Sequence, residues 1–240
     1  MIVLLKLDNN KKKEIIFNND TYFRYPVKTK IIYPDNNLLE ILDKETGDFL
    51  KNKDIVFVAE SIIAISEGRV FKFSEIKYGK TAEILSNFVT KTSAGIGLGT
   101  PQTMQLAINE VGYLKIIFAA ILAGVGKIFN KKGIFYKITG DKVRGIDGPT
   151  SDTIPPYNEY ASLSPSNPKD FVKKAEKFFQ EKKKINLQFI VIDANDLGVN
   201  ILGAKNNKEE RLAKNLVADN PLGQSDQSTP FLICRKKDEL

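Results

Sequence analysis

Three short polar segments carry oxygen atoms that could hold a metal ion. They contain Asp147 in a GIDG stretch, Asp193 and Asp196 in DANDLG, and Gln224 in LGQSD. Each segment alone is a common turn sequence, because Asp, Asn and Gly favour turns. Together they supply three or four hard ligands from separate parts of the chain, as a metal that bridges substrate phosphates requires. The set therefore indicates phosphate chemistry that uses an oxygen-bound divalent cation.

The residue types that are missing narrow the chemistry further. The chain of 240 residues has no histidine and a single cysteine, Cys234. This composition excludes Ser-His-Asp and Cys-His catalysis, HExxH zinc sites, four-cysteine zinc sites and internal disulfides. Any chemistry must use carboxylates, amides, hydroxyls and lysines, and a bound metal is expected to be Mg²⁺, Mn²⁺ or Ca²⁺ rather than Zn²⁺ or Cu²⁺.

The elements that position these residues are strands and helices in irregular alternation. A buried strand over 185–193 places Asp193 at its carboxyl end, where ligands bind in open α/β sheets. A hairpin over 133–146 delivers Asp147 into a long proline-rich loop. The other predicted elements are hairpin strands within 1–32, a buried strand over 54–60, helices over 81–89, 101–129, 168–179 and 208–217, and a last strand over 231–235.

This alternation predicts an α+β fold with mixed β-sheets and packed helices. We expect one domain over residues 1–240, with a division into two lobes, about 1–130 and 131–240, as the alternative. With 42% hydrophobic and 27% charged residues, the chain has the profile of a folded globular protein.

The positive charge of the chain leaves an anionic partner open. The formal net charge is +7 and the isoelectric point is near 9.2. Much of the excess lies in two lysine-rich stretches, 11–13 and 173–184, without tryptophan or an RNA-binding aromatic signature. A scaffold that binds nucleic acid through the second stretch is therefore the lowest-ranked alternative, because helices often solvate one face with lysine.

No targeting signal is recognised. The N-terminal apolar stretch is too short for a signal peptide, so we interpret the terminal Lys-Asp-Glu-Leu as a coincidence. The apolar run over 116–125 is shorter than the about 20 residues that a membrane helix needs. We expect a cytoplasmic protein without a membrane partner.

Two glycine-containing stretches are similar to phosphate-binding loops. Gly79-Lys80-Thr81 lacks the glycine that a P-loop needs five residues before Gly79, where Ser74 stands. The glycine-rich stretch over 95–99 precedes a predicted helix and could cradle an anion, although a hinge is the favoured interpretation.

Five stretches, in order, resemble the coenzyme F-420 gamma-glutamyl ligase family, also called coenzyme F-420-0:L-glutamate ligase. They are VKTKIIYPDNNLLEIL, DIVFVAESIIAISEGRV, GID, IVIDANDLG and LGQSDQSTPFLICR. The Ser-Glu-Gly-Arg stretch and the Gly-Gln-Ser-Asp segment followed by Thr-Pro are the most specific. The similarity spans most of the chain and implies the family's α+β fold and a homodimer.

The resemblance implies a GTP-dependent ligase that uses two divalent ions, Mg²⁺ or Mn²⁺. Such an enzyme phosphorylates an acceptor carboxylate, and the amine of L-glutamate then attacks the acyl phosphate. The implied metal ligands are Asp147, Asp196 and Gln224, with Asp193 as a competitor for the middle position. The implied nucleotide-binding residues are Ser61, Glu67 and Gly68.

The chain also departs from the family pattern. It has Glu60-Ser61 where the ligases have Ser-Lys, and Val199 where they have arginine. It lacks their histidine upstream of GID, and the stretch over 203–208 is too short for their substrate-side insertion. These departures leave the acceptor open. They also keep a second hypothesis, a catalytically inactive relative that binds an anionic ligand or a partner.

Overall fold

The chain forms two compact units in the computed structural model, which describes residues 11–89, 96–131, 133–151, 153–195, 198–222 and 227–239. The sheet unit comprises Met1–Glu67 and Asn167–Leu240, and the helical unit comprises Gly68–Ser166. The middle of the chain is thus inserted into the sheet unit. These bounds differ from the alternative raised by the sequence, in which two lobes divide near residue 130.

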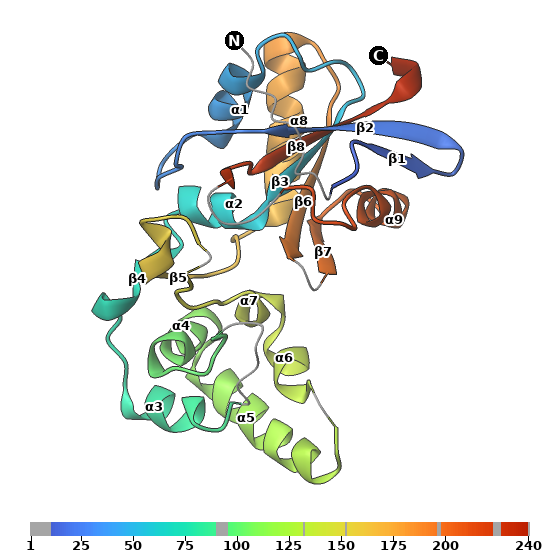
Figure 1. Ribbon diagram of the computed structural model, residues 1–240. Helices are drawn as coiled ribbons and strands as arrows, with labels where there is room; N and C mark the ends of the chain where they lie inside the picture. Colours follow the sequence, from blue (N-terminus) through green and yellow to red (C-terminus); the bar gives the residue numbers. More distant parts are fainter. Residues whose placement is uncertain are drawn as a thin grey trace. The chain divides into compact units, whose positions relative to one another are not determined.

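The sheet unit is built on a six-stranded sheet with the order β1-β2-β8-β3-β6-β7. Its strands are β1 (Glu14–Phe17), β2 (Asp20–Val27), β3 (Ile55–Ala59), β6 (Gln188–Asn195), β7 (Gly198–Gly203) and β8 (Phe231–Lys236). Only β3 and β6 run parallel among these neighbours; the other neighbouring pairs are antiparallel. The mixed sheet with its helices confirms the predicted α+β class (Figure 1).

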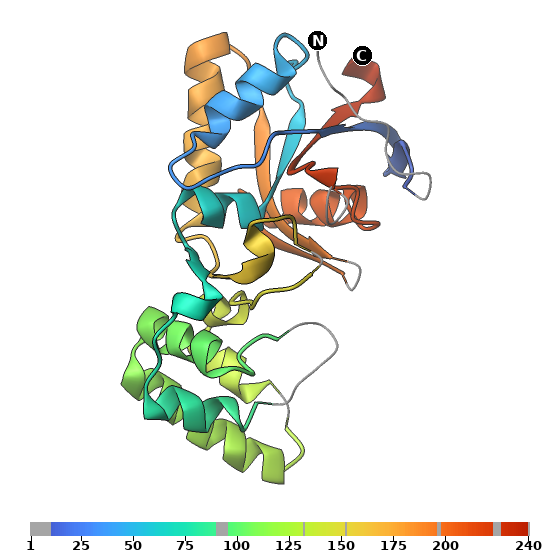
Figure 2. The ribbon, with the colours of Figure 1, turned by 60° about the vertical axis from the view of Figure 1, so that its left-hand side comes forward.

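Helices cover both faces of this sheet, as Figure 2 shows. They are α1 (Leu38–Thr46), α2 (Glu60–Ser66), α8 (Pro168–Lys183) and α9 (Asn207–Leu216), followed at the chain's end by the short 3-10 helix η4 (Lys237–Glu239). Phe57 and Ile190 lie in the core beneath α9, whereas Phe189 stacks on Phe179 of α8 with ring centroids 5.6 Å apart. Because side chains alternate along a strand, one apolar run supplies both faces.

Asparagine side chains set where three of these helices begin. The side chains of Asn37, Asn167 and Asn206 each accept hydrogen bonds from first-turn N–H groups of α1, α8 and α9. Pro168 follows as the first helical residue of α8, where its missing N–H is not needed. These caps confirm the predicted start of α8 and fix its register against the sheet.

Among the described residues of the sheet unit, two buried arginines pair with carboxylates. Arg235 donates to both carboxylate oxygens of Asp54, at 2.7 and 2.6 Å, and the two side chains are 4% and 0% exposed. The second pair, Arg24 with Asp219, joins β2 to the segment after α9. A buried charge needs such a partner, so each pair ties distant parts of the chain together.

The helical unit contains a short antiparallel strand pair and five helices among its described residues. The elements are β4 (Val70–Lys72), β5 (Tyr160–Ser162), α3 (Lys80–Ser86), α4 (Pro101–Val111), α5 (Tyr113–Ile128), α6 (Ile134–Thr139) and α7 (Asp141–Arg144), with short 3-10 helices at Phe73–Glu75 and Tyr157–Glu159. Leu98, Met104 and Ile116 are buried in its core together with Val143 and Ile146.

Two sequence predictions are wrong in this unit. The hairpin over 133–146 is instead α6 and α7, which meet at Gly140 with φ +90°. The alternating run IFYKI is too short to distinguish a strand from a helix, and packing against α5 decides for the helix. The single helix over 101–129 is broken at Gly112, whose φ of +88° ends α4 and starts α5.

This break also bears on the membrane expectation. In the described part of the chain no single helix has the length and hydropathy to cross a membrane. Helices α4 and α5 pass such a test only together, and they are bent by 117° at the break.

Candidate active site

The carboxyl ends of the parallel strands bring predicted residues from two segments to one edge of the sheet. Ala59 of β3 pairs with Ile192 of β6, so the next residues, Glu60 and Asp193, lie at the same edge. Ser61 follows at the start of α2 and is exposed, whereas Asp193 is half-buried. Figure 1 shows α2 leaving β3 beside the end of β6. The predicted buried strand is present, but β6 continues past Asp193 to Asn195, because residues 193–195 pair with β7.

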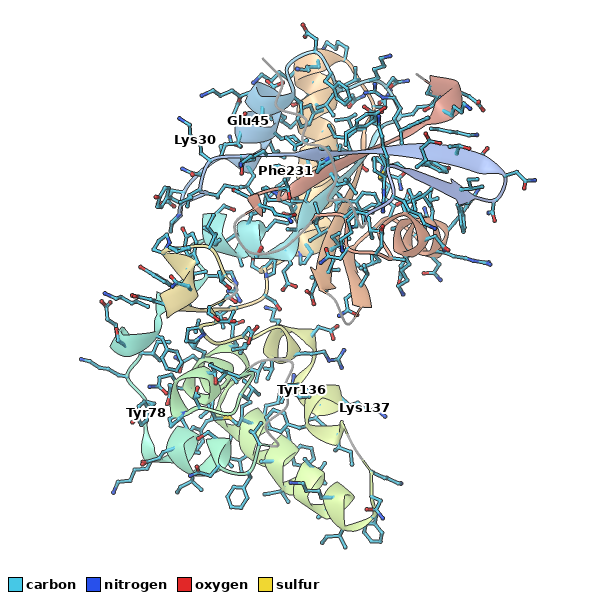
Figure 3. The ribbon with its side chains drawn as sticks, in the orientation of Figure 1. Lys30, Glu45, Tyr78, Tyr136, Lys137 and Phe231 are labelled. Carbon is cyan, nitrogen blue, oxygen red and sulfur yellow. The ribbon has the colours of Figure 1, made fainter. Side chains whose placement is uncertain are left out.

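Two further segments reach this edge through backbone hydrogen bonds. The N–H of Ala59 donates to the carbonyl of Pro230 at 2.9 Å, which places the residues before β8 next to the end of β3. The N–H of Thr29 donates to the carbonyl of Ser228 at 3.0 Å, and the Ser228 hydroxyl donates to the carbonyl of Thr29 at 3.0 Å. Phe231, the first residue of β8, is labelled in Figure 3.

Two residues of the sheet unit, Thr29 and Asn220, have buried polar atoms with unmet hydrogen-bonding capacity among the described residues. Asn220 is 2% exposed, and neither its amide nitrogen nor its amide oxygen has a partner among the described residues. The hydroxyl oxygen of Thr29, at 6% exposure, also has no partner among them. Because an unsatisfied buried polar group costs about 1–3 kcal/mol, such groups mark where a polar partner fits.

The segment that carries Asn220 is held by a guanidinium–carboxylate pair. Arg24, 1% exposed, donates to Asp219 at 2.8 Å and to the carbonyl of Leu216 at 3.1 Å. Burial alone would raise the pKa of Asp219, but the hydrogen bonds and charge of Arg24 outweigh burial and lower it. The Thr229 hydroxyl donates to the carbonyl of Leu222, so both flanks of residues 223–226 are fixed.

Asp147 lies in the helical unit, beside the short strand pair. It forms an isolated antiparallel bridge with Ser162, with N–H to carbonyl distances of 3.1 and 2.9 Å. Its carboxylate is exposed and accepts the N–H of Gly148 at 2.8 Å. A Cβ on Gly148 would lie 3.1 Å from the Cβ of Ile96, so this loop and the end of the glycine-rich stretch touch.

Tyr136 of α6, labelled in Figure 3, lies near this loop. Its hydroxyl would be 4.0 Å from a Cβ built on Gly97. Burial raises the pKa of Tyr136, the charge of Arg144 acts in the opposite direction, and Asp147 adds to the increase. The phenol therefore stays a neutral hydrogen-bonding group at physiological pH.

The proposed nucleotide residues do not form one cluster. Ser61 is in the first turn of α2, whereas Glu67 follows its last residue, about 9 Å further along the helix axis. Gly68 has φ +66°, a conformation that favours glycine, and turns the chain into the helical unit. Arg69 then donates to Glu110 at 2.8 Å and to the carbonyl of Ser164 at 2.6 Å.

The predicted metal ligands are only partly described. Asp147 and Asp193 lie in different units, and Asp193 accepts a hydrogen bond from Asn200 at 3.4 Å. Asp196 and Gln224 lie outside the described residues. Within the described ranges, no group of three or more His, Cys, Asp or Glu residues could hold a metal ion. The four-residue ligand set stays a prediction.

Sequence reasoning missed Thr29 and Asn220. Thr29 lies within the VKTKII stretch, but its role depends on pairing with the residues before β8, far along the chain. Asn220 precedes Pro221 and has φ +48°, so the Asn-Pro turn was a local signal for an unusual backbone.

The lysine-rich stretch over 173–184 is largely paired with carboxylates. Lys182 and Lys183 both contact Asp43, at 3.0 and 2.6 Å. Lys174 pairs with Asp170 and Lys177 with Glu181 along the helix. These pairs reduce the unbalanced positive charge that a nucleic acid would meet.

Comparison with known proteins agrees with the motifs at this edge of the sheet. The family model F420-0:Gamma-glutamyl ligase matches residues 26–200, which include Thr29, Ser61, Asp147 and Asp193. A search of curated proteins finds no match. Since the family model covers well over half of the chain, the chain belongs to the F420-0:gamma-glutamyl ligase family.

Proposed function

We propose that the protein is a GTP- and divalent-metal-dependent amide ligase that adds L-glutamate to a carboxylate acceptor. Family membership supports the ligase class. The observation that carries the proposal to the site is the convergence of Ser61, Asp193 and Thr29 at the carboxyl edge of β3 and β6. Asn220, whose amide has no partner among the described residues, lies two residues before Leu222, whose carbonyl accepts from Thr229. Polar groups gathered at such an edge are typical of a phosphate-substrate site.

The donor set fits a hard cation. Asp147, Asp193, Asp196 and Gln224 offer only carboxylate and amide oxygens, which Mg²⁺ and Mn²⁺ prefer. The one cysteine, Cys234, is fully buried in the sheet unit and cannot compete as a soft ligand. When bound, the cation would neutralise negative charge on the phosphates.

The proposed reaction has two chemical steps. The acceptor carboxylate attacks the γ-phosphorus of GTP, GDP leaves, and an acyl phosphate forms. The amine of L-glutamate then attacks the acyl carbon, phosphate leaves, and the amine loses a proton. In our proposal the Ser61 hydroxyl donates to a phosphate oxygen, Asn220 and Thr29 bind a polar group of a substrate, and Glu67 and Gly68 border the nucleotide. Such positioning supplies much of the catalysis in phosphoryl transfer.

A second candidate function is an inactive relative that binds an anionic ligand or a partner protein. Glu60 is the observation that favours it, because this half-buried carboxylate lies at the sheet edge beside Ser61. A carboxylate there repels phosphate at neutral pH. Arg69, which could offset that charge, pairs with Glu110.

The first test compares thermal unfolding with GTP, ATP and GDP, each with and without Mg²⁺ or Mn²⁺. A ligand at 100 times its Kd stabilises the native state by about 2.7 kcal/mol. We expect a stabilising shift with GTP and metal in the wild type, and its loss in Asp147→Ala and Asn220→Leu. Asp141→Ala is the matched control, because its exposed side chain pairs only with Arg144 on the surface among the contacts described.

The second test measures release of GDP and phosphate with L-glutamate and a carboxylate acceptor. Turnover that requires both substrates supports the ligase. Nucleotide binding without turnover on any acceptor supports the inactive relative. Absence of any nucleotide effect under every metal condition contradicts the ligase proposal.

A further inference from the structure

Tyr136 carries a hydroxyl group that the described residues of the chain do not use. Its ring packs edge-on against Phe135, with ring centroids 5.6 Å apart, and the side chain is half-buried on α6. No hydrogen bond among the described residues involves the hydroxyl oxygen, Oη. A tyrosine hydroxyl that is shielded from water usually finds a partner. The ring is therefore held by packing, and the hydroxyl is available to a bound molecule.

Another tyrosine of the helical unit shows what a structural hydroxyl does. The hydroxyl of Tyr113 is hydrogen-bonded to the hydroxyl of Thr81, which joins α5 to α3. The hydroxyl of Tyr136 forms no such link between elements of the described chain. Its removal should therefore leave the stability of the folded unit unchanged.

A tight turn of the glycine-rich stretch lies beside the Tyr136 hydroxyl. The turn is closed by the N–H of Gly99, which donates to the carbonyl of Ile96 at 3.0 Å. Gly97 has φ +49°, and a Cβ built on it would lie 4.0 Å from Oη of Tyr136. Because glycine has no side chain, Gly97 places only backbone next to the hydroxyl.

The loop that carries Asp147 meets the same turn. A Cβ on Gly148 would lie 3.1–3.2 Å from three side-chain carbons of Ile96, so the two segments touch. Asp147 is held in this loop by its backbone bridge with Ser162. Its carboxylate is close enough for the negative charge to act on the phenol of Tyr136. One turn of the helical unit thus has a predicted metal ligand and a hydroxyl donor beside it.

These two groups together suit a phosphate that is bound with a cation. A phenol carries its proton at neutral pH, so it can donate a hydrogen bond without repelling an anion. A carboxylate such as Asp147 binds a hard cation, and alone it repels phosphate. A phosphate whose charge is offset by the cation offers oxygen atoms that accept a strong hydrogen bond.

We propose that the hydroxyl of Tyr136 donates a hydrogen bond to a phosphate oxygen of the bound nucleotide, next to Asp147. This inference rests on the proposed function and adds a residue that contacts the substrate. The sequence motifs do not include Tyr136, because it belongs to a helix where the sequence predicts a strand.

The test measures the Kd of GTP and of GDP, each with Mn²⁺, for the full chain by isothermal titration calorimetry. Tyr136→Phe keeps the ring and removes only the hydroxyl. We expect the Kd of GTP to rise about 10-fold, as for the loss of one hydrogen bond to a charged group. An increase for GTP alone assigns the contact to the γ-phosphate, and an equal increase for GDP assigns it to a phosphate that both nucleotides share.

Two other tyrosines serve as controls. Tyr78, labelled with Tyr136 in Figure 3, is 47% exposed and has no hydrogen bond from its hydroxyl among the described residues. Tyr78→Phe should bind nucleotide like the wild type. Tyr113→Phe should lower the unfolding temperature without changing the Kd of GTP, because its hydroxyl links two helices. Tyr136→Phe should show the reverse, a weaker nucleotide complex and an unchanged unfolding temperature without ligand.

The results separate this inference from the ligase proposal. If Asp147→Ala weakens binding of GTP with Mn²⁺ and Tyr136→Phe does not, the ligase proposal stands and the assignment of Tyr136 is wrong. The assignment is also wrong if Tyr136→Phe changes only the KM of a carboxylate acceptor, or if it lowers the unfolding temperature without ligand. If the wild type binds no nucleotide with any metal, both proposals fail.

Discussion

The two units differ in how deeply their ion pairs are buried and in how much apolar surface they expose. The sheet unit covers both faces of its sheet with helices and buries the Arg235–Asp54 pair. It also buries Arg24, whose partner Asp219 is 33% exposed. Among its described residues, the helical unit has one partly buried pair, Arg69 with Glu110, and it leaves large apolar side chains of α5 exposed. Most of the large apolar side chains that are exposed therefore belong to the helical unit.

Breaking the most buried ion pair should have the largest effect. Asp54→Asn leaves the Arg235 charge inside the sheet unit without its partner, so we expect a loss of about 3–5 kcal/mol in the free energy of unfolding. Urea denaturation followed by circular dichroism measures the loss. The surface pair of Lys214 with Glu210 is the control, and Glu210→Gln should change stability by less than about 0.5 kcal/mol.

The same experiment applied to the helical unit sharpens the comparison. Glu110→Gln removes a charge from a pair whose side chains are 19% and 15% exposed, and we expect a smaller loss than for Asp54→Asn. Equal losses for the two variants would contradict the distinction drawn between the units.

A second prediction concerns helix-to-sheet packing in the sheet unit. A Cβ on Gly203 of β7 would lie 2.9 Å from the backbone oxygen of Pro168 and 3.2 Å from Val172. Gly203→Ala should therefore push α8 away from the sheet and cost about 1–3 kcal/mol in the free energy of unfolding. Gly124→Ala serves as a reference, since Gly124 lies inside a helix and nothing lies within 4 Å of its Cβ position. A loss at Gly203 no larger than the change at Gly124 would argue against close packing of α8.

A third prediction uses pH to isolate the Arg24–Asp219 pair. The pKa of Asp219 is lowered in the folded protein, so the unfolded state takes up its proton first as pH falls. The stabilisation should be complete above the unfolded pKa of about 3.9 and disappear as pH falls through the lower folded value.

Unfolding free energies of the wild type and Asp219→Asn, measured from pH 7 down to pH 2, test this prediction. The difference between the two proteins should be constant near neutral pH and shrink below about pH 4. A difference that does not change with pH would show that the Asp219 charge is not what stabilises the segment.

The smallest effect is expected within α5. A Cβ on Gly126 would lie 2.1 Å from the Cδ1 of Ile134, whereas Gly124 has nothing within 4 Å. Gly124→Ala should stabilise the helical unit by about 0.5–1 kcal/mol through helix propensity, and Gly126→Ala should gain less or lose stability. Thermal unfolding of both variants tests the close approach of α5 to α6.

The parts of the fold that the sequence predicts well are those with strong local patterns. The buried strand that contains Asp193 has a continuous apolar run, and the helix that begins at Pro168 has a clear cap. Both elements are present, although the strand ends at Asn195 and not at Asp193. The prediction of a hairpin over 133–146 is wrong because a short alternation of apolar and polar residues does not distinguish a strand from a helix. The insertion of one unit into the other depends on pairing of Val27 with Phe231, which no local pattern signals.

The residues of the candidate site also differ in how well local sequence predicts them. The position of Asp193 follows from its own strand, so the sequence was sufficient. Thr29 and Asn220 belong to the site only because the strands around them are brought together by long-range pairing. Neither the composition nor the spacing of residues indicates that the polar atoms of Thr29 and Asn220 are buried.

The interleaved order of the units has a consequence for synthesis on the ribosome. Strand β2 cannot pair with β8 until residues 231–236 have been made, whereas all of Gly68–Ser166 is available earlier. Local contacts form faster than contacts distant in sequence, so the helical unit should fold first, during translation. The nascent chain would then present the apolar side of α5 while the sheet is still incomplete. This interval is when a chaperone is most needed, before the sheet that completes the fold exists.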